Sequence, residues 1–438
     1  MKKVAFYTLG CKVNQYETQA MCELFIKKGY CEVGFEEKAD IYVINTCSVT
    51  SLSDRKSRQM IRRAKRLNPN AVVIAAGCYA QTAADEVSKI EGVNLVIGTS
   101  GRKNIVELAE SLGNNDVHIA VSDIMHTHEF ESLSVHGYDG KTRAYIKAQE
   151  GCSQFCSYCI IPYARGPIRS RPEEEVISEA KRLAENGFCE LVLVGIHIAS
   201  YGKDLKNTSL GRIICKIAEI DAVKRIRLSS IEPMTLDEEF IRTVSSAGDK
   251  LCRHFHISLQ SGCDRTLERM NRKYHTADFA GIVDGLRRLS DDVAVTTDVM
   301  VGFPGETDEE FNESLNFVKK IGFADLHVFQ YSPRPGTPAA KMEGQVDPAV
   351  KHERSTLMIK AGEESRSSFL SRFIGRTLSV LFEQKHEHKE GFYEGKTENY
   401  ITIVSASESD ISGRFAHVKA ERAENGMIFG KIIDFIQD

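Results

Sequence analysis

The sequence has no run of about eighteen consecutive apolar residues, so we expect no transmembrane helix. Residues 1–15 also lack the apolar stretch and cleavage site of a secretory signal peptide. We therefore expect a cytosolic protein. Its 42% hydrophobic and 27% charged residues are typical of a globular chain.

Positive charge is not in excess either, because the formal net charge is −4. Such a chain has no overall attraction for nucleic acid, so any RNA binding must depend on local basic patches. Disulfides are not expected, because the cytosol keeps thiols reduced. The remaining possible roles of the 12 cysteines are metal ligation, catalysis or burial as small hydrophobic side chains.

At 438 residues the chain is too long for one compact core, and we expect two or three domains. Near its start, short β-branched runs alternate with helical stretches, which predicts a doubly wound parallel sheet in a domain at 1–118. The predicted strands cover residues 4–9, 41–45, 72–76 and 95–97, and the predicted helices cover residues 17–28, 53–67, 83–90 and 103–112. A polar stretch at 119–141 is expected to be a linker.

A second alternating series predicts a partial (β/α)6 TIM-like barrel at 142–368, with its chemistry at the C-terminal ends of the strands. Its predicted strands cover residues 144–149, 191–195, 226–229, 254–259, 294–301 and 325–331, with helices at 173–186, 236–245, 308–321 and 349–369. The pattern then changes to period two, at 377–382, 400–404, 414–420 and 426–435. This change predicts a small antiparallel β-barrel at 370–438.

Cys152, Cys156 and Cys159 form a C-x3-C-x2-C pattern just after the first strand of the predicted barrel. Three thiolates this close can hold three irons of a cubane cluster and leave the fourth iron open, as catalysis requires. The alternative is a zinc knuckle that uses one more cysteine or histidine. Zinc does not explain the position at a strand end, so we favour the open iron–sulfur cluster.

Cys11, Cys47 and Cys78 follow the first, second and third predicted strands. Ligands gather outside the carboxyl ends of the strands in an open parallel sheet, so these side chains are expected to meet at one edge. A single cysteine is more often simply buried. Their shared position nevertheless favours a second cluster with three cysteine ligands.

The C-x3-C-x2-C spacing is the signature of the radical S-adenosylmethionine (SAM) superfamily, and residues 143–334 resemble its partial barrel. With the N-terminal cysteine set, the whole chain resembles the radical SAM methylthiotransferase family, which ends in a TRAM domain. The resemblance implies two 4Fe–4S clusters, one that cleaves SAM at Cys152, Cys156 and Cys159, and an auxiliary one that delivers sulfur. The remaining cysteines match no ligand position and are expected to be structural: Cys22, Cys31, Cys189, Cys215, Cys252 and Cys263.

Three strings indicate a subgroup of this family: TLGCKVNQYET at 8–18, NTCSVTSLSDRKSRQMIRRA at 45–64 and TTDVMVGFPGETDEEF at 296–311. They resemble the subgroup that converts threonylcarbamoyladenosine at tRNA position 37 to its 2-methylthio form. Lys12 and Val13 carry the distinction, because the isopentenyladenosine subgroup more typically has TYGCQMN there. The subgroup that modifies an aspartate of a ribosomal protein has a variant of SLGCPKN. Both remain alternatives.

The resemblance also implies SAM contacts. Tyr158 precedes the last cluster cysteine, where an aromatic ring usually lies beside the SAM adenine, and Gly195 lets the backbone approach the methionine end. Glu232 and Gln260 end two barrel strands near the polar groups of SAM, and Tyr331 ends the last strand on the adenine side. For each residue, barrel packing or loop geometry is the alternative.

Seven basic residues crowd the predicted helix after Cys47, opposite an apolar stripe, and Ser51 or Ser53 is expected to cap it. A solvated charged face is the usual explanation of such a run. Because few acidic residues balance these charges within the helix, we predict that they contact RNA phosphates beside the auxiliary cluster. The seven are Arg55, Lys56, Arg58, Arg62, Arg63, Lys65 and Arg66. By contrast, residues 372–438 hold nine Lys/Arg against eleven Asp/Glu, and they predict no comparable basic face.

The implied reaction uses two SAM molecules. One methylates a sulfur at the auxiliary cluster, and the other gives a 5′-deoxyadenosyl radical that abstracts hydrogen from carbon 2 of the adenine. An anticodon-loop base is unpaired and can reach the barrel mouth without opening a duplex. The resemblance also implies a low-potential electron donor such as flavodoxin or ferredoxin. A zinc-stabilised RNA-binding protein without catalytic activity is the competing class.

Overall fold

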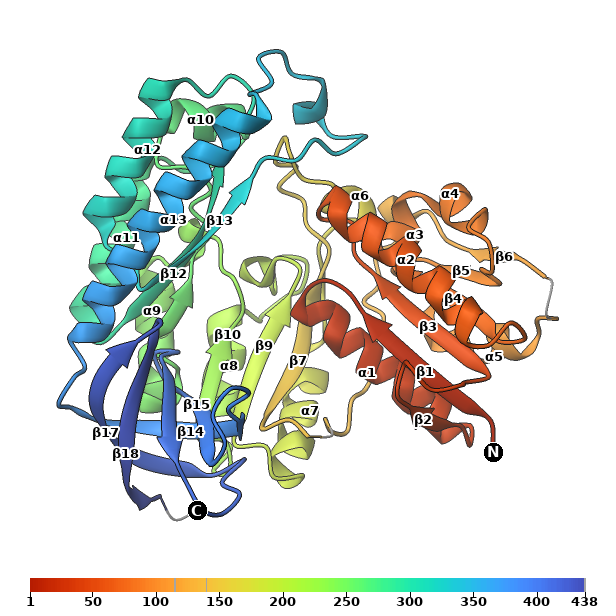
Figure 1. The fold of residues 1–438 in the computed structure, drawn as a ribbon, viewed down its shortest axis with the longest axis horizontal. Helices are drawn as coiled ribbons and strands as arrows, with labels where there is room; N and C mark the ends of the chain where they lie inside the picture. Colours follow the sequence, from red (N-terminus) through yellow and green to blue (C-terminus); the bar gives the residue numbers. More distant parts are fainter. Residues whose placement is uncertain (114–115, 139, 437–438) are drawn as a thin grey trace.

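The protein was analysed as a computed structural model that describes residues 1–113, 116–138 and 140–436. An N-terminal α/β domain, a half-open barrel and a small β-barrel follow one another along the chain (Figure 1). The expected linker at 119–141 includes residue 139, which lies outside the described residues. None of the helices in the described ranges is long and apolar enough to cross a bilayer.

The N-terminal domain contains a six-stranded sheet in the order β2-β1-β3-β4-β5-β6, with every pairing parallel. Its strands are β1 (Lys3–Thr8), β2 (Cys31–Val33), β3 (Ile41–Thr46), β4 (Val72–Gly77), β5 (Leu95–Ile97) and β6 (His118–Ala120). Helices α1 (Lys12–Lys27) and α5 (Ile105–Glu110) pack on one face. Helices α2 (Ser51–Leu67), α3 (Cys78–Thr82) and α4 (Ala84–Ser88) pack on the other. The predicted doubly wound sheet is confirmed, and the short β2 and β6 were not predicted.

The central domain contains the six predicted strands, divided between two sheets. One sheet has the order β10-β9-β7-β8 and the other β11-β12-β13, and only isolated bridges such as Ile226–Leu251 join them. The strands are β7 (Arg143–Glu150), β8 (Arg169–Ser170), β9 (Glu190–Gly195), β10 (Arg225–Leu228), β11 (His254–His256), β12 (Ala294–Val301) and β13 (Asp325–Gln330). The helices are α6 (Ile161–Arg165), α7 (Glu173–Glu185), α8 (Leu210–Ala218), α9 (Glu238–Val244), α10 (Asp264–Arg269), α11 (Thr276–Leu289), α12 (Asp308–Ile321) and α13 (Pro348–Ser371).

Alternation along these strands defines an inner face. Apolar residues such as Ile146, Leu193 and Ile226 belong to the large core that the outer helices share. Their strand neighbours therefore point inward, and these are mostly polar: Arg143, Lys147, Glu190, Arg225, Arg227, His254, His256, Asp298 and His327. Part of this inner face stays open, since Phe329 on β13 is 49% exposed.

The C-terminal domain is a closed barrel in the order β14-β15-β16-β18-β17. Its strands are β14 (Thr377–Lys385), β15 (Phe392–Thr397), β16 (Thr402–Ala406), β17 (Phe415–Glu424) and β18 (Met427–Phe435). All pairings are antiparallel except β16 with β18. Its loop after β15 meets the start of the central strands, where Arg227 donates to the carbonyls of Thr397 and Glu398 at 3.1 and 2.9 Å. The Tyr400 ring stacks on His254 with centroids 4.7 Å apart, so this loop covers the floor of the half-open barrel.

Candidate functional site

The first cysteine set lies at the edge of the N-terminal sheet where the strand order reverses. Cys11 follows β1, Cys47 follows β3 and Cys78 begins α3 after β4. The helices that follow β1 and β3 cover opposite faces, so this edge is the topological switch point at which open parallel sheets bind ligands. Gly10, at φ 103°, lies so close that an added Cβ would be 3.0 Å from the Sγ of Cys47. The loop of Cys11 therefore rests directly on Cys47.

The described residues include one group of three side chains whose ligand atoms lie within 4.8 Å of one another: His256, Asp298 and His327. The two cysteine sets offer thiols, which are the donors that iron–sulfur clusters use.

Arg165 connects the two cysteine sets. It is the last residue of α6, the short helix that follows Cys159, and its Nε donates to the Sγ of Cys78 at 3.2 Å. Over its five residues α6 rises only about 7 Å along its axis. The carbonyl of Ala164 in the same helix accepts from Thr99 of the N-terminal domain at 2.7 Å. The segment after Cys159 is therefore anchored directly to the first set.

A buried charge network holds Arg165 in place. Its Nη1 donates to Glu17 at 2.6 Å and to Glu150 at 3.1 Å, and its Nη2 donates to the side-chain oxygen of Asn14 at 2.6 Å. The cations of the network exceed its carboxylates by one. The cations are Arg102, Lys147, Arg165 and Arg169, and the carboxylates are Glu17, Glu131 and Glu150.

Ionisation of these groups follows from burial and charge. Burial alone would raise the pKa of Glu17, but Arg102, Arg165 and Lys147 hold it well below its usual value. Burial raises the pKa of Cys78 to about 12, against the opposing charge of Arg165. Ligation by metal must displace the thiol proton, and Arg165 supplies positive charge where the thiolate forms.

The second cysteine set lies beyond the C-terminal end of β7 in a tightly fixed loop. The backbone N–H of Cys152 donates to Gly166 at 3.0 Å, and that of Cys159 donates to Cys156 at 3.0 Å. Burial raises the pKa of Cys152 to about 11 and that of Cys159 to about 12. Backbone hydrogen bonds therefore hold this loop at Cys152 and at Cys159.

Arg272 has the same relation to this set as Arg165 has to the first. Its Nη1 donates to the Sγ of Cys156 at 3.3 Å, and its Nη2 donates to both carboxylate oxygens of Glu232 at 3.0 and 2.9 Å. Burial would raise the pKa of Glu232, but His197 and Arg272 lower it. Each cysteine set therefore has one guanidinium within hydrogen-bond distance of one of its sulfurs. Sequence reasoning missed both arginines.

Of the five residues predicted to contact SAM, Tyr158 lies in this loop and the other four lie at or after the C-terminal ends of barrel strands. Tyr158 and the buried Tyr331 both pack edge-on against Phe303, with centroids 6.4 and 5.4 Å apart. The hydroxyl of Tyr331 is buried and has no hydrogen-bond partner among the described residues. Gly195 ends β9, and an added Cβ would lie 2.9 Å from Oε1 of Gln149.

Glu232 and Gln260 lie in the loops after β10 and β11. Glu232 is held by Arg272, as described above, and lies 3.6 Å from Nε2 of His197. Gln260 has the left-handed φ of 66° and accepts from the backbone of Met300 at 2.8 Å. Both loops are therefore at the C-terminal end of the barrel strands, on the side of the second cysteine set.

Lys12 and Val13 reach the inner face of the barrel. Val13 is buried against Val192 and Val194 of β9. Burial lowers the pKa of Lys12, and Tyr400 of the covered floor is among the groups whose charge acts against that shift. The two residues that carry the subgroup distinction therefore face the barrel interior.

A histidine–aspartate group on the inner face was not predicted. Nε2 of His256 lies 3.2 Å from Asp298, and Nδ1 of His327 lies 3.3 Å from the same carboxylate. Hydrogen bonding to Asp298 raises the pKa of His327. The three residues come from three adjacent strands, and no sequence spacing reveals their contact.

The basic helix is α2, and its exposed side carries the predicted residues. A surface hollow of about 900 Å3 is lined by Arg55, Arg58, Arg62, Lys65 and Arg66. Not all of the cations are free, because Arg63 pairs with Glu36 at 2.5 Å and Arg58 with Glu86 at 3.4 Å. The cap is Thr50, which accepts from the backbone of Ser53, so the expected cap at Ser51 or Ser53 was wrong. In the described ranges, Arg55, Lys56, Arg62 and Arg66 make no hydrogen bond or ion pair.

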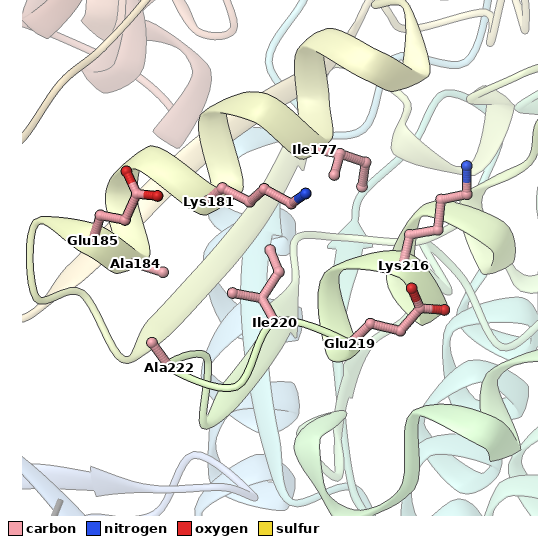
Figure 2. Close-up of a pocket in the computed structure, with 8 residues that line it drawn as sticks. All are labelled: Ile177, Lys181, Ala184, Glu185, Lys216, Glu219, Ile220 and Ala222. Carbon is pink, nitrogen blue, oxygen red and sulfur yellow. The ribbon is translucent and has the colours of Figure 1, made fainter.

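A second hollow lies outside the barrel. Figure 2 shows side chains from α7, α8 and the loop that follows, which line a space of about 540 Å3. Its lining includes Lys181, Lys216 and Glu219 and neither cysteine set, so it is separate from the candidate site.

Comparisons with known proteins match this geometry. Family models match at residues 3–98 (Uncharacterized protein family UPF0004), 146–318 (Radical SAM superfamily) and 371–433 (TRAM domain). A Bacillus subtilis (strain 168) relative named threonylcarbamoyladenosine tRNA methylthiotransferase MtaB is 43% identical, over 100% of this chain and 98% of its own. A Pelotomaculum thermopropionicum relative named tRNA-2-methylthio-N(6)-dimethylallyladenosine synthase is 33% identical, over 98% of this chain and 97% of its own.

Solved structures share the fold. The chain resembles the radical SAM methyltransferase TsrM from Kitasatospora setae, with a TM-score of 0.57, 18% identity, and coverage of 78% of this chain and 77% of that one. It also resembles the cobalamin-dependent radical SAM enzyme OxsB, with a TM-score of 0.51, 9% identity, and coverage of 83% and 56%. The expected arrangement of an N-terminal α/β domain and a partial barrel is therefore confirmed.

Proposed function

The chain belongs to the radical SAM tRNA methylthiotransferase family, and on that premise we propose that it methylthiolates carbon 2 of N6-threonylcarbamoyladenosine at position 37 of tRNA. The observation that carries the proposal is the 43% identity to an MtaB relative along the whole chain. The relative named for dimethylallyladenosine is 33% identical, and that substrate has less support. The ribosomal-protein aspartate is a third candidate with no support among these relatives.

Radical SAM enzymes use SAM and a 4Fe–4S cluster, and we assign that cluster to Cys152, Cys156 and Cys159. We further assign a second 4Fe–4S cluster to Cys11, Cys47 and Cys78. The three thiol donors of each set and the guanidinium at each set suit such clusters. When bound, a cluster at Cys152, Cys156 and Cys159 would supply the electron that cleaves SAM, and a cluster at Cys11, Cys47 and Cys78 would supply the sulfur that is transferred.

The protein's own residues orient these groups. Arg165 and Arg272 donate to one sulfur in each set and hold the sets in fixed positions. Around SAM we place Tyr158, Gly195, Glu232, Gln260 and Tyr331. The unpartnered hydroxyl of Tyr331 supports a polar ligand nearby, and the missing side chain of Gly195 allows close approach of the backbone.

The tRNA partner follows from the proposed reaction, and the TRAM match supports it. We propose that the cations of α2 contact phosphates of the anticodon arm. A low-potential donor such as flavodoxin or ferredoxin would supply electrons, and a tRNA substrate implies a cytoplasmic enzyme. We place the domains at 1–118, 142–368 and 370–438, with a linker at 119–141.

The test is a reaction with reconstituted full-length enzyme, SAM and a chemical reductant. Two tRNAs are compared, one with threonylcarbamoyladenosine and one with isopentenyladenosine at position 37, and the nucleosides are analysed by mass spectrometry. We expect the 2-methylthio product only from the first tRNA. Product from the second alone, or from neither, would contradict the proposal.

A further inference from the structure

Lys12 is a cation of the barrel's inner face that lacks an anionic partner. It is half-buried in the first turn of α1, next to Val13, which is fixed against β9. The charged groups near it include Tyr400, Arg143, Arg227 and Glu190, which belong to the covered floor. Across residues 1–113, 116–138 and 140–436, no hydrogen bond or ion pair of its side chain occurs.

Nearby carboxylates are already engaged by arginines. Glu190 lies 2.7 Å from Arg227 and 3.7 Å from each of Arg143 and Arg225. Glu383 lies 2.8 Å from Arg143. The positive charge of Lys12 is therefore surplus on a surface that is shielded from bulk water, and such a charge favours an anionic ligand.

We propose that Lys12 binds the carboxylate of the threonylcarbamoyl group and selects this substrate over adenosines with uncharged N6 substituents. The inference rests on the proposed function and names the residue that reads its substrate. Threonine is joined to N6 through its amino group, so its carboxylate is free and negatively charged near neutral pH. A lysine is suited to such a group as a point charge with several donors.

The length of the threonylcarbamoyl group is consistent with this role of Lys12. The carboxylate carbon lies at most about 9 Å from carbon 2 of the adenine, given bond lengths near 1.4 Å. Lys12 follows Cys11, a proposed ligand of the sulfur-delivering cluster, and adjacent Cα atoms are about 3.8 Å apart. A base whose carbon 2 faces that cluster therefore places its N6 substituent within range of the Lys12 side chain. The isopentenyl substituent of isopentenyladenosine carries no charge, so it would gain nothing from this lysine.

The experiment measures binding and does not depend on turnover. Anticodon stem-loop RNAs carry threonylcarbamoyladenosine, its threoninamide analogue or unmodified adenosine at position 37, and Kd for the reconstituted full chain is read by fluorescence anisotropy. The variants are Lys12→Gln, Lys12→Arg and the matched control Lys27→Gln, which changes an exposed lysine at the other end of α1. Iron and sulfide contents are compared with wild type, because Lys12 adjoins Cys11.

We expect Lys12→Gln to weaken binding of the threonylcarbamoyl RNA by about ten- to hundredfold, as for loss of a charge-assisted hydrogen bond. Binding of the other two RNAs should change less than about twofold, and Lys12→Arg should keep part of the preference. Equal weakening for all three RNAs would show a phosphate contact and overturn the inference, as would no change. If wild type forms no methylthio product from threonylcarbamoyl tRNA, the proposed function fails. If it does and Lys12→Gln still binds normally, only the inference fails.

Discussion

Replacing Arg165 by methionine tests the connection between the two cysteine sets. The substitution keeps an unbranched side chain of similar length, but it removes the donors to Cys78, Glu17, Glu150 and Asn14. Glu17 and Glu150 would stay buried with fewer cations around them. Removing one partner of a buried charged pair typically costs about 3–5 kcal/mol in the free energy of unfolding.

The cost is measured from urea unfolding of the cluster-free protein. Far-ultraviolet circular dichroism is the signal, because the chain has no tryptophan. The matched control is Arg212→Met. The Arg212 side chain is 53% exposed and lies 2.9 Å from Glu173. We expect that change to cost about 0–1 kcal/mol. In the reconstituted protein, Arg165→Met should also make the cluster at Cys11, Cys47 and Cys78 harder to reduce, because the hydrogen bond to the Sγ of Cys78 is lost.

Two outcomes would refute this reasoning. A loss below about 1 kcal/mol for Arg165→Met would show that the buried network does not depend on the arginine. Equal losses of unfolding free energy for both variants would show that burial does not change the cost of removing the arginine. An unchanged reduction potential of the cluster at Cys11, Cys47 and Cys78 would show that Arg165 does not tune that cluster, even if the fold is weakened.

Three further predictions concern the cysteine loop, the RNA surface and pH. Gly10→Ala should lower the iron bound at the first set, because the new methyl group would lie 3.0 Å from the Sγ of Cys47 in a left-handed backbone; iron analysis and absorption spectra measure this. Neutralising three unpaired cations of α2 should weaken tRNA binding and reduce the slope of log K against log salt by about 2–3, as measured by titration at several salt concentrations; the three are Arg55, Arg62 and Arg66. His327→Gln should destabilise the protein more at low pH than at high pH, as measured by Tm. The Asp298 contact raises the folded pKa of His327, so its stabilisation is complete below the unfolded value of about 6.5 and is lost as pH rises through the folded value.

Each of these predictions has a control. Gly29→Ala changes another glycine with positive φ, but nothing lies within 4 Å of the added Cβ, so cluster content should be normal. Arg63→Gln removes a cation already paired with Glu36 and should change the salt slope less than an unpaired cation does. A pH-independent difference in Tm for His327→Gln would contradict the assigned role of Asp298.

Local periodicity predicted most of the fold because the central strands of the N-terminal sheet and of the half-open barrel are short, apolar and regularly spaced. It placed Cys11, Cys47 and Cys78 at strand ends, and parallel pairing then brings them to one edge. The missed β2 and β6 are three-residue edge strands, and β15 reads FYEGKT, with polar and glycine residues that weaken the strand pattern. Short edge strands form through contacts that a local window does not contain.

The arginines at the cysteine sets were beyond sequence reasoning for a different reason. Arg165 is 87 residues from Cys78, and Arg272 is 116 residues from Cys156. Nothing in the local pattern distinguishes a buried, ion-paired arginine from an exposed one. The one available signal was that Arg165 ends the apolar CIIPYAR segment after Cys159, where an unpaired charge would be costly to bury.

The most direct test of the central claim uses a bacterial strain that lacks its own methylthiotransferases and expresses this chain or its Cys78→Ala variant. Nucleosides from bulk tRNA are quantified by mass spectrometry. We predict 2-methylthio-N6-threonylcarbamoyladenosine with the wild-type chain, and only the unthiolated precursor with Cys78→Ala. Equal amounts of the methylthio nucleoside from both chains, or none from the wild-type chain when its iron content is complete, would contradict the assignment of sulfur insertion to the first cysteine set.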